Sequence, residues 1–159
     1  MRIVLAMVLF PAMLAADHLP ANLVARGDPE SVLCGIAVNH TRVSELMEKL
    51  GKPQVYEKYP KTKDAAEITW TNSGSKIHVF INVDDVAYAV EVSGVATPVA
   101  ATGRGLRLGG SREELEHIYG SRFATHGSRR IFQWQDGTEM RVTMVHGRIT
   151  RLVLVAPVE

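Results

Sequence analysis

A segment that occurs twice constrains the fold of this chain more than any other feature. The two copies run from Gly35 to Gly51 and from Gly105 to Gly120. Each copy reads Gly, apolar, any residue, apolar, two spacer residues, Ser or Thr, then Arg, and continues as an amphipathic run that ends at glycine. A Trp, a polar turn and alternating strands follow each copy. We therefore expect two tandem repeats of helix and sheet in this chain of 159 residues.

Capping signals place one helix in each copy. In the second copy, Ser111 and Glu114 have the spacing of a capping box, and the closing glycine is expected to stop the helix. In the first copy, Thr41 is expected to cap a helix over 42–50, whose apolar residues fall at helical spacing. A further short helix is expected over 29–34, since Asp28 suits an N-cap and a proline follows it.

Alternating residues place the strands. In the first repeat we expect strands at 67–71, 76–83 and 86–92, and in the second at 131–134, 139–145 and 148–155. Asp136-Gly137 is a strong hairpin signal between two of these strands. The expected fold class is α+β, in which each repeat adds a three-stranded antiparallel meander to one continuous sheet with the helices on one face.

The composition of the chain predicts where each repeat begins and ends and where a linker joins them. We expect a signal peptide at 1–16, a flexible leader at 17–27, the first repeat at 28–93, a linker at 94–102 and the second repeat at 103–159. Removal of the signal peptide would leave no stable membrane span and a periplasmic or secreted protein. We expect no lipid anchor, because Leu33 precedes Cys34 and this cysteine lies far from the apolar stretch.

Charge argues against some partners. The formal net charge of +1 and the lack of a basic cluster give no case for nucleic acid. From residue 17 to 102 there are 8 Lys or Arg against 11 Asp or Glu, and from 103 onward 9 Arg against 6 Asp or Glu. These balances of −3 and +3 favour two diverged repeats with solvated faces, and the alternative is attraction between the repeats or a polarised surface for a partner.

No motif for catalysis or cofactor binding is expected. The six histidines have no metal-ligand spacing, and the glycines of the second copy lack the lysine of a phosphate loop. No serine lies in a nucleophile elbow, and the paired carboxylates fit a turn and a first helical turn. We therefore expect no metal, no cofactor and no catalytic residues, and we expect that the protein is not an enzyme.

The repeat resembles a known family. A Gly-apolar-x-apolar segment, a capped helix ending Leu-Gly-x-Pro and a later Trp before alternating strands resemble the SmpA/OmlA group of small bacterial envelope proteins. The matching residues are Gly35, Ile36, Val38, Thr41, Leu46, Leu50, Gly51, Pro53 and Trp70. That group includes an accessory subunit of the outer-membrane protein assembly machine. Two such units in tandem are similar to the secreted β-lactamase inhibitor protein, whose repeats form one concave sheet.

Helices on one sheet face leave the other face free, and an aromatic residue among arginines and amides suits protein binding. The residues expected to bind a partner are His78, Phe80, Asn82, Arg141, Thr143 and Arg151, with Tyr56 and Tyr59 from the connection at 54–66. The predicted partner is another envelope or secreted protein, and the oligomeric state is left open. The alternatives are binding of an anionic or lipid-like small molecule, and a hydrolase that uses Cys34.

Overall fold

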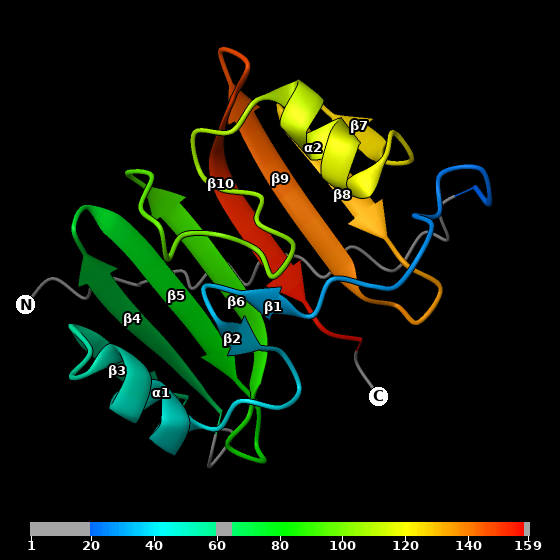
Figure 1. Ribbon diagram of the computed structural model, residues 1–159. Coiled ribbons are helices and arrows are strands. Elements are labelled where there is room, and N and C mark those ends of the chain that lie inside the picture. The colour runs from blue at the N-terminus through cyan, green and yellow to red at the C-terminus, as the bar shows by residue number, and fades with distance from the viewer. Residues whose placement is uncertain (1–19, 60–64, 158–159) are drawn as a thin grey trace, which may run out of the picture.

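The computed structural model describes residues 20–59 and 65–157, and the signal peptide expected at 1–16 lies outside these residues. Within them the chain forms an α+β fold of two short helices and a large open antiparallel sheet of eight strands (Figure 1). A separate two-stranded hairpin lies beside this sheet. The predicted fold class is therefore confirmed.

The sheet is built from two four-stranded meanders. In chain order its strands are β3 (Val55–Lys58), β4 (Ala66–Asn72), β5 (Ser75–Ile81), β6 (Ala87–Gly94), β7 (Ala124–His126), β8 (Arg129–Gln133), β9 (Glu139–Val145) and β10 (Arg148–Val155). Their order in space is β3-β4-β5-β6-β10-β9-β8-β7, so the two meanders meet where β6 pairs with β10. The expectation of three strands in each repeat was wrong, because β3 and β7 add an edge strand at each end.

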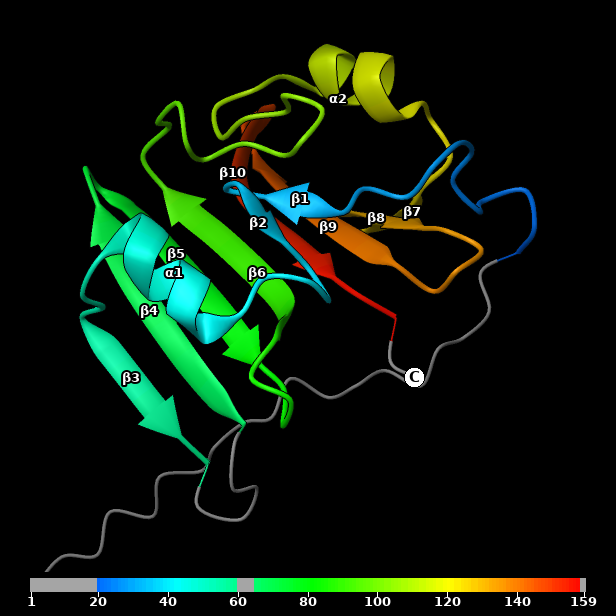
Figure 2. The same cartoon turned by 60° about the horizontal axis from the view of Figure 1, so that its bottom comes forward.

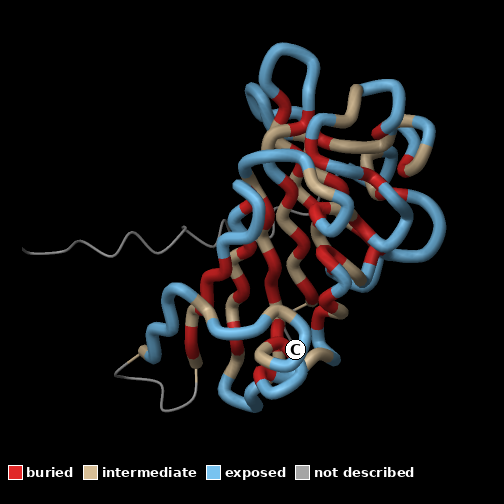
Figure 3. Tube along the Cα trace, turned by 60° about the vertical axis from the view of Figure 1, so that its left-hand side comes forward, coloured by how far each residue is buried: buried red, intermediate tan, exposed pale blue. Residues whose placement is uncertain are grey.

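One face of this sheet forms the core. Along β5, Ile77, Val79 and Ile81 are buried and alternate with less buried residues, which Figure 3 shows as a change of colour along the strands. Leu152 of β10 lies opposite Val92 of β6 and joins the two halves on the same face. The buried side chains form one cluster that extends through both repeats. The eight strands therefore form one continuous sheet with a single hydrophobic core.

Both helices and the small hairpin pack on this buried face. The helices are α1 (Val43–Leu50) and α2 (Arg112–Tyr119), and the hairpin consists of β1 (Val32–Leu33) and β2 (Ile36–Ala37). Figure 2 shows the hairpin over β6 and β10, between α1 and α2. In the described ranges, no helix has the length and apolar character needed to cross a membrane.

The capping box of α2 is confirmed. Ser111 donates its N–H to Glu114 Oε2 at 2.7 Å, and the Glu114 N–H is 3.2 Å from Ser111 Oγ. The prediction for α1 was wrong by one residue, because its N-cap is Arg42, whose N–H donates to Glu45 Oε2 at 2.7 Å. The hydroxyl of Thr41 instead accepts the Ala37 N–H at 3.0 Å and closes the turn before the helix.

The short helix expected over 29–34 is absent, and β1 and the start of its hairpin occupy this range. Glu30 is buried there, and its Oε1 accepts the N–H groups of Ser31 and Val32, each at 3.0 Å. Its other oxygen accepts the Arg104 N–H from the second repeat at 3.3 Å. These contacts hold the segment extended, so a tertiary partner outweighs the local helix signal.

The segments expected as leader and linker both contact the folded repeats. Ala25 is buried and donates its N–H to Gln133 O of β8 at 2.9 Å. Ala101 accepts the Cys34 N–H at 2.8 Å, and its neighbour Ala100 is completely buried. Residues 20–27 therefore lie against the second repeat, and residues 94–102 pack beside the β1–β2 hairpin.

Candidate functional site: the open sheet face

The sheet face opposite the helices, here called the open face, carries three lateral rows of side chains. Because strand residues alternate between faces, every second residue of each strand belongs to it. The register joins these residues from strand to strand. The middle row crosses all eight strands as Val55, Thr69, His78, Glu91, Val153, Arg141, Ile131 and Ala124.

The two outer rows carry opposite charge. One, the basic row, contains Thr71, Lys76, Ser93, Arg151, Thr143, Arg129 and His126. The other, the acidic row, contains Glu57, Glu67, Phe80, Ala89, Val155, Glu139 and Gln133. The basic row has no carboxylate and the acidic row no cation, so the open face is polarised along the strand direction.

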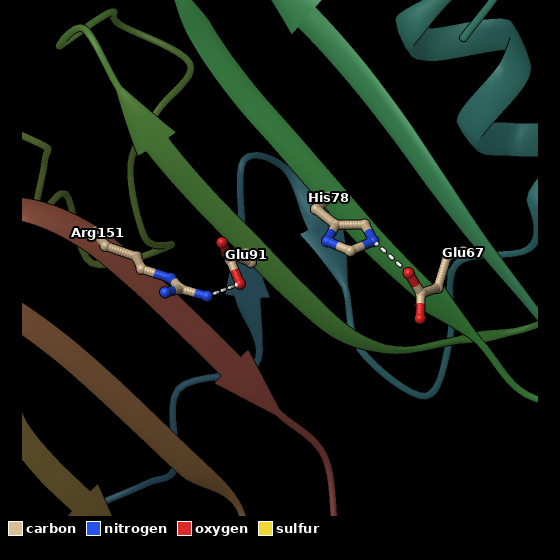
Figure 4. A network of polar contacts seen from close by, with 4 residues as sticks. All are labelled: Glu67, His78, Glu91 and Arg151. Carbon is tan, nitrogen blue, oxygen red and sulfur yellow. Dashed lines mark hydrogen bonds and ion pairs between the residues drawn. The ribbon is translucent and has the colours of Figure 1, made fainter. Parts of the chain in front are cut away.

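Hydrogen bonds and ion pairs connect the rows. His78 Nε2 lies 3.1 Å from Glu67 Oε2, and an Arg151 guanidinium nitrogen lies 2.5 Å from Glu91 Oε2 (Figure 4). Arg141 donates to Glu139 in the same manner. In each pair the basic side chain reaches toward the acidic row. These paired groups are therefore held in place before any partner arrives, which lowers the entropic cost of binding.

An aromatic group lies among these charges. The rings of His78 and Phe80 are 4.4 Å apart between centroids, and those of Phe80 and Tyr88 are 6.2 Å apart. The pairing of β5 with β6 shifts register after Phe80, and Tyr88 lies at this irregularity. Burial raises the pKa of Tyr88, and the negative charge of Glu67 raises it further. Tyr88 therefore stays neutral and available as a hydrogen-bond donor.

Five of the eight residues proposed from sequence lie together on the open face. They are His78, Phe80, Arg141, Thr143 and Arg151. Asn82 lies beyond the end of β5, where its Oδ1 accepts the N–H groups of Asp84 and Val86, each at 3.0 Å. Placing Asn82 on the strand face was therefore wrong, because its side chain is committed to the turn.

The two tyrosines of the connection also lie elsewhere. Tyr56 is in the edge strand β3, opposite the buried Ile68. It therefore lies on the sheet face that carries the helices, not on the open face. It is 43% exposed, and Lys58 Nζ lies 5.9 Å from its ring centroid. Tyr59 is half-buried and donates its N–H to Ala65 O at 3.0 Å. Neither residue joins the group on the open face.

The sequence reasoning missed four residues of this face: Glu67, Tyr88, Glu91 and Glu139. Each carboxylate is the partner of a basic side chain that was predicted from the sequence to bind a partner. The signal was present, because each glutamate is a polar position that alternates with apolar residues in a predicted strand. Only the register between strands brings Glu67 to His78 and Glu91 to Arg151, whereas Glu139 and Arg141 lie two residues apart on one strand.

Comparison with known proteins gives a fold and no family. No family model matches the chain, and no curated protein matches it. A cysteine-rich secretory protein from Staphylococcus aureus is similar in structure with a TM-score of 0.60 and 12% identity, and the match covers 84% of this chain and 49% of that one. This chain therefore spans about half the length of that neighbour.

A DUF4309 family protein, YjgB, from Bacillus subtilis has a TM-score of 0.50 and 14% identity. That match covers 77% of this chain and 82% of the other. The likeness is one of fold. Identities this low carry no residue roles across, so the open face has to be interpreted from its own geometry.

Cys34 has an environment unlike that of a nucleophile. It is 6% exposed, and burial raises the pKa of its thiol to about 12, although a backbone hydrogen bond with Ala101 opposes part of the rise. The thiol is therefore protonated at neutral pH, whereas the thiolate is the reactive form. His40, six residues further along the chain, is exposed. This environment does not favour the hydrolase alternative.

The described residues also contain no cluster of possible metal ligands. Within residues 20–59 and 65–157, no group of three or more His, Cys, Asp or Glu side chains is placed to hold a metal ion. Three carboxylates of the open face, those of Glu67, Glu91 and Glu139, are each engaged by a basic side chain. The chemistry that this face offers is recognition by charge, hydrogen bonds and aromatic contact.

Proposed function

We propose that this protein is an exported, non-catalytic interaction module that binds another envelope or secreted protein through the open face. The observation that carries the proposal is the aromatic group of His78, Phe80 and Tyr88 set between ion pairs on a sheet face opposite both helices. Tyrosine and arginine are enriched at the centres of protein interfaces, where they bury large areas and still form hydrogen bonds.

The charge distribution of the open face restricts which partner surfaces can bind to it. Lys76, Arg151 and Arg129 supply the cations of the basic row, and Glu57, Glu67 and Glu139 supply the carboxylates of the acidic row. A partner surface with an acidic stripe opposite the basic row and a basic stripe opposite the acidic row would match the two outer rows. Association should therefore weaken as salt screens the outer rows.

Export is the second part of the proposal. The amino-terminal sequence has the pattern of a signal peptide, and one structural neighbour is a secretory protein. The SmpA/OmlA-like motif in the first repeat supports the same compartment, since that group works in the bacterial envelope. We propose that the chain consists of two units of this type whose sheets have merged through β6 and β10.

The test is capture of a partner from envelope extract by the immobilised protein, with mass spectrometry to identify it. The double variant Phe80→Ala and Arg141→Ala should lose this partner, because it removes the aromatic centre and a cation of the middle row. A second variant, Thr143→Arg, keeps every existing ion pair and places a large side chain on the face. It should weaken capture because its long side chain obstructs the face, an effect larger than the gain from one added exposed charge.

A matched control is Val99→Ala with Arg107→Ala, which alters two exposed residues of the loops before α2. This control should capture the partner at the wild-type level. Far-UV circular dichroism and thermal melting check that each variant is folded. If the Phe80 and Arg141 double variant and Thr143→Arg are folded and both capture the partner normally, binding through the open face is disproved.

A further inference from the structure

A cavity lies between residues 21–29 and the hairpin that joins β8 to β9. Its volume is about 640 Å³, within the range of ~300–1,000 Å³ typical of small-molecule sites. Val24 and Pro29 supply apolar wall from the leader side, and Trp134 supplies an aromatic wall from the end of β8. The cavity belongs to the side of the core cluster that includes Trp134, and is therefore separate from the open face.

The wall residue Trp134 contains an unmet hydrogen-bond donor. Its side chain is 4% exposed, and its Nε1–H is buried with no acceptor among the described residues. The corresponding tryptophan of the first repeat, Trp70, donates its Nε1–H to Gly51 O at 2.9 Å. A buried donor without a partner is rare in native proteins because it loses its bond to water without replacement.

Two arginines line the same cavity. Arg26 comes from the leader, and Arg122 follows α2. Among the residues that the structure describes, neither forms an ion pair within 4.0 Å. The one carboxylate of the lining, Asp136, is already engaged, because its oxygens accept the Thr138 N–H at 2.9 Å and the Thr138 hydroxyl at 2.8 Å. The lining therefore has a formal excess of one positive charge.

We propose that this cavity binds an amphiphilic anion, with a single negatively charged head group on a short apolar chain. Arg26 and Arg122 hold the head group, and Val24, Pro29 and the Trp134 ring contact the chain. An acceptor oxygen of the ligand takes the Trp134 Nε1–H, with a small shift of residues 21–27 that lets it reach this atom. The site combines a buried donor that has no acceptor with two arginines that form no ion pair among the described residues.

The probe experiment uses the indole N–H resonances of the folded protein in a ¹H–¹⁵N correlation spectrum. The chain has two tryptophans, so two such signals are expected, and Trp70→Phe assigns them. Octanoate and octyl phosphate are titrated separately, with octanol as the uncharged control. The Trp134 signal should shift downfield with an anion while the Trp70 signal stays in place. Comparison of the two anions distinguishes a carboxylate ligand from a phosphate ligand.

Arg26→Gln and Arg122→Gln should each weaken binding of the effective anion by about two- to fivefold, the effect of losing one partly solvated ion pair. Arg129→Gln, which removes a cation of the open face, should leave the affinity unchanged. Thermal melting checks that all three variants are folded. The proposal is overturned if neither anion shifts the Trp134 signal, if octanol binds as well as the anions, or if Arg129→Gln weakens binding as much as the other two.

Discussion

The hydroxyl group of Tyr119 on α2 donates a hydrogen bond to the carboxylate of Glu30, which lies 89 residues earlier in the chain. The same hydroxyl lies 2.7 Å from Thr102 Oγ1, which in turn accepts the Leu106 N–H at 3.1 Å. The Arg104 guanidinium carbon lies 5.3 Å from the centroid of the Tyr119 ring. This buried network joins the amino-terminal segment, the loop before α2 and α2 itself.

Removal of the Tyr119 hydroxyl should destabilise the protein. Tyr119→Phe leaves Glu30 with its backbone donors but without its side-chain partner, and we expect a loss of about 1–2 kcal/mol in the free energy of unfolding. Urea denaturation measures this loss. The control Tyr88→Phe removes a half-exposed hydroxyl of the open face and should cost less than about 0.5 kcal/mol. Equal stability of Tyr119→Phe and wild type would contradict this role.

The buried thiol of Cys34 should make stability depend on pH in alkaline solution. Burial raises its pKa from the ordinary 9.0 to about 12 in the folded state, so the unfolded chain loses the proton first as pH rises. The contribution of the protonated Cys34 thiol to stability is therefore present in full below the pKa of this thiol in the unfolded chain. It is lost as the pH rises from there through the pKa of the thiol in the folded protein.

The size of this effect can be measured by difference. Between about pH 8 and about pH 10, wild type should lose about 1 kcal/mol more unfolding free energy than Cys34→Ala, which lacks the titrating group. Both proteins contain the same tyrosines, so the difference isolates the thiol. In addition, the native thiol should react with Ellman's reagent only after denaturation. Fast reaction of the native protein would show that Cys34 is accessible.

Gly94 at the end of β6 should not tolerate alanine. Its φ is +99°, and a Cβ there would lie 2.4 Å from the carbonyl oxygen of Gly74 across the hairpin. We expect Gly94→Ala to cost about 3 kcal/mol or more, because backbone has to move. Gly127 has φ +60° and no heavy atom within 4 Å of such a Cβ. Gly127→Ala should cost only about 1 kcal/mol, and similar melting temperatures for the two variants would refute the argument.

The two tryptophans should respond differently to the same substitution. Trp70 and Trp134 are 3% and 4% exposed, so Phe leaves a similar gap at each position. Trp70→Phe also removes the bond to Gly51, whereas Trp134→Phe removes a donor that has no acceptor. We expect Trp70→Phe to be the more destabilising by about 1 kcal/mol. Chemical denaturation of both variants tests this order, and the reverse order would indicate that Trp134 has an acceptor in solution.

Features that depend on a few neighbouring residues could be predicted from the sequence. The capping box of Ser111 and Glu114 and the Asp136-Gly137 turn are examples, since their hydrogen bonds close within a few residues. Strict alternation located β5, and from it came His78 and Phe80 of the candidate site. The edge strands β3 and β7 were missed because they are short and mostly exposed, and so show no apolar alternation.

The amino-acid sequence by itself determined the repeat, the fold class and which strand positions are polar. Only the tertiary structure decided that Glu30 enters a buried network rather than a helix, and that Asn82 closes a turn. It also decided the pairing of β6 with β10, which brings Arg151 to Glu91. The physical reason is that capping and alternation act over a few residues, whereas the burial of a carboxylate or the register of two distant strands depends on the partner supplied by another part of the chain.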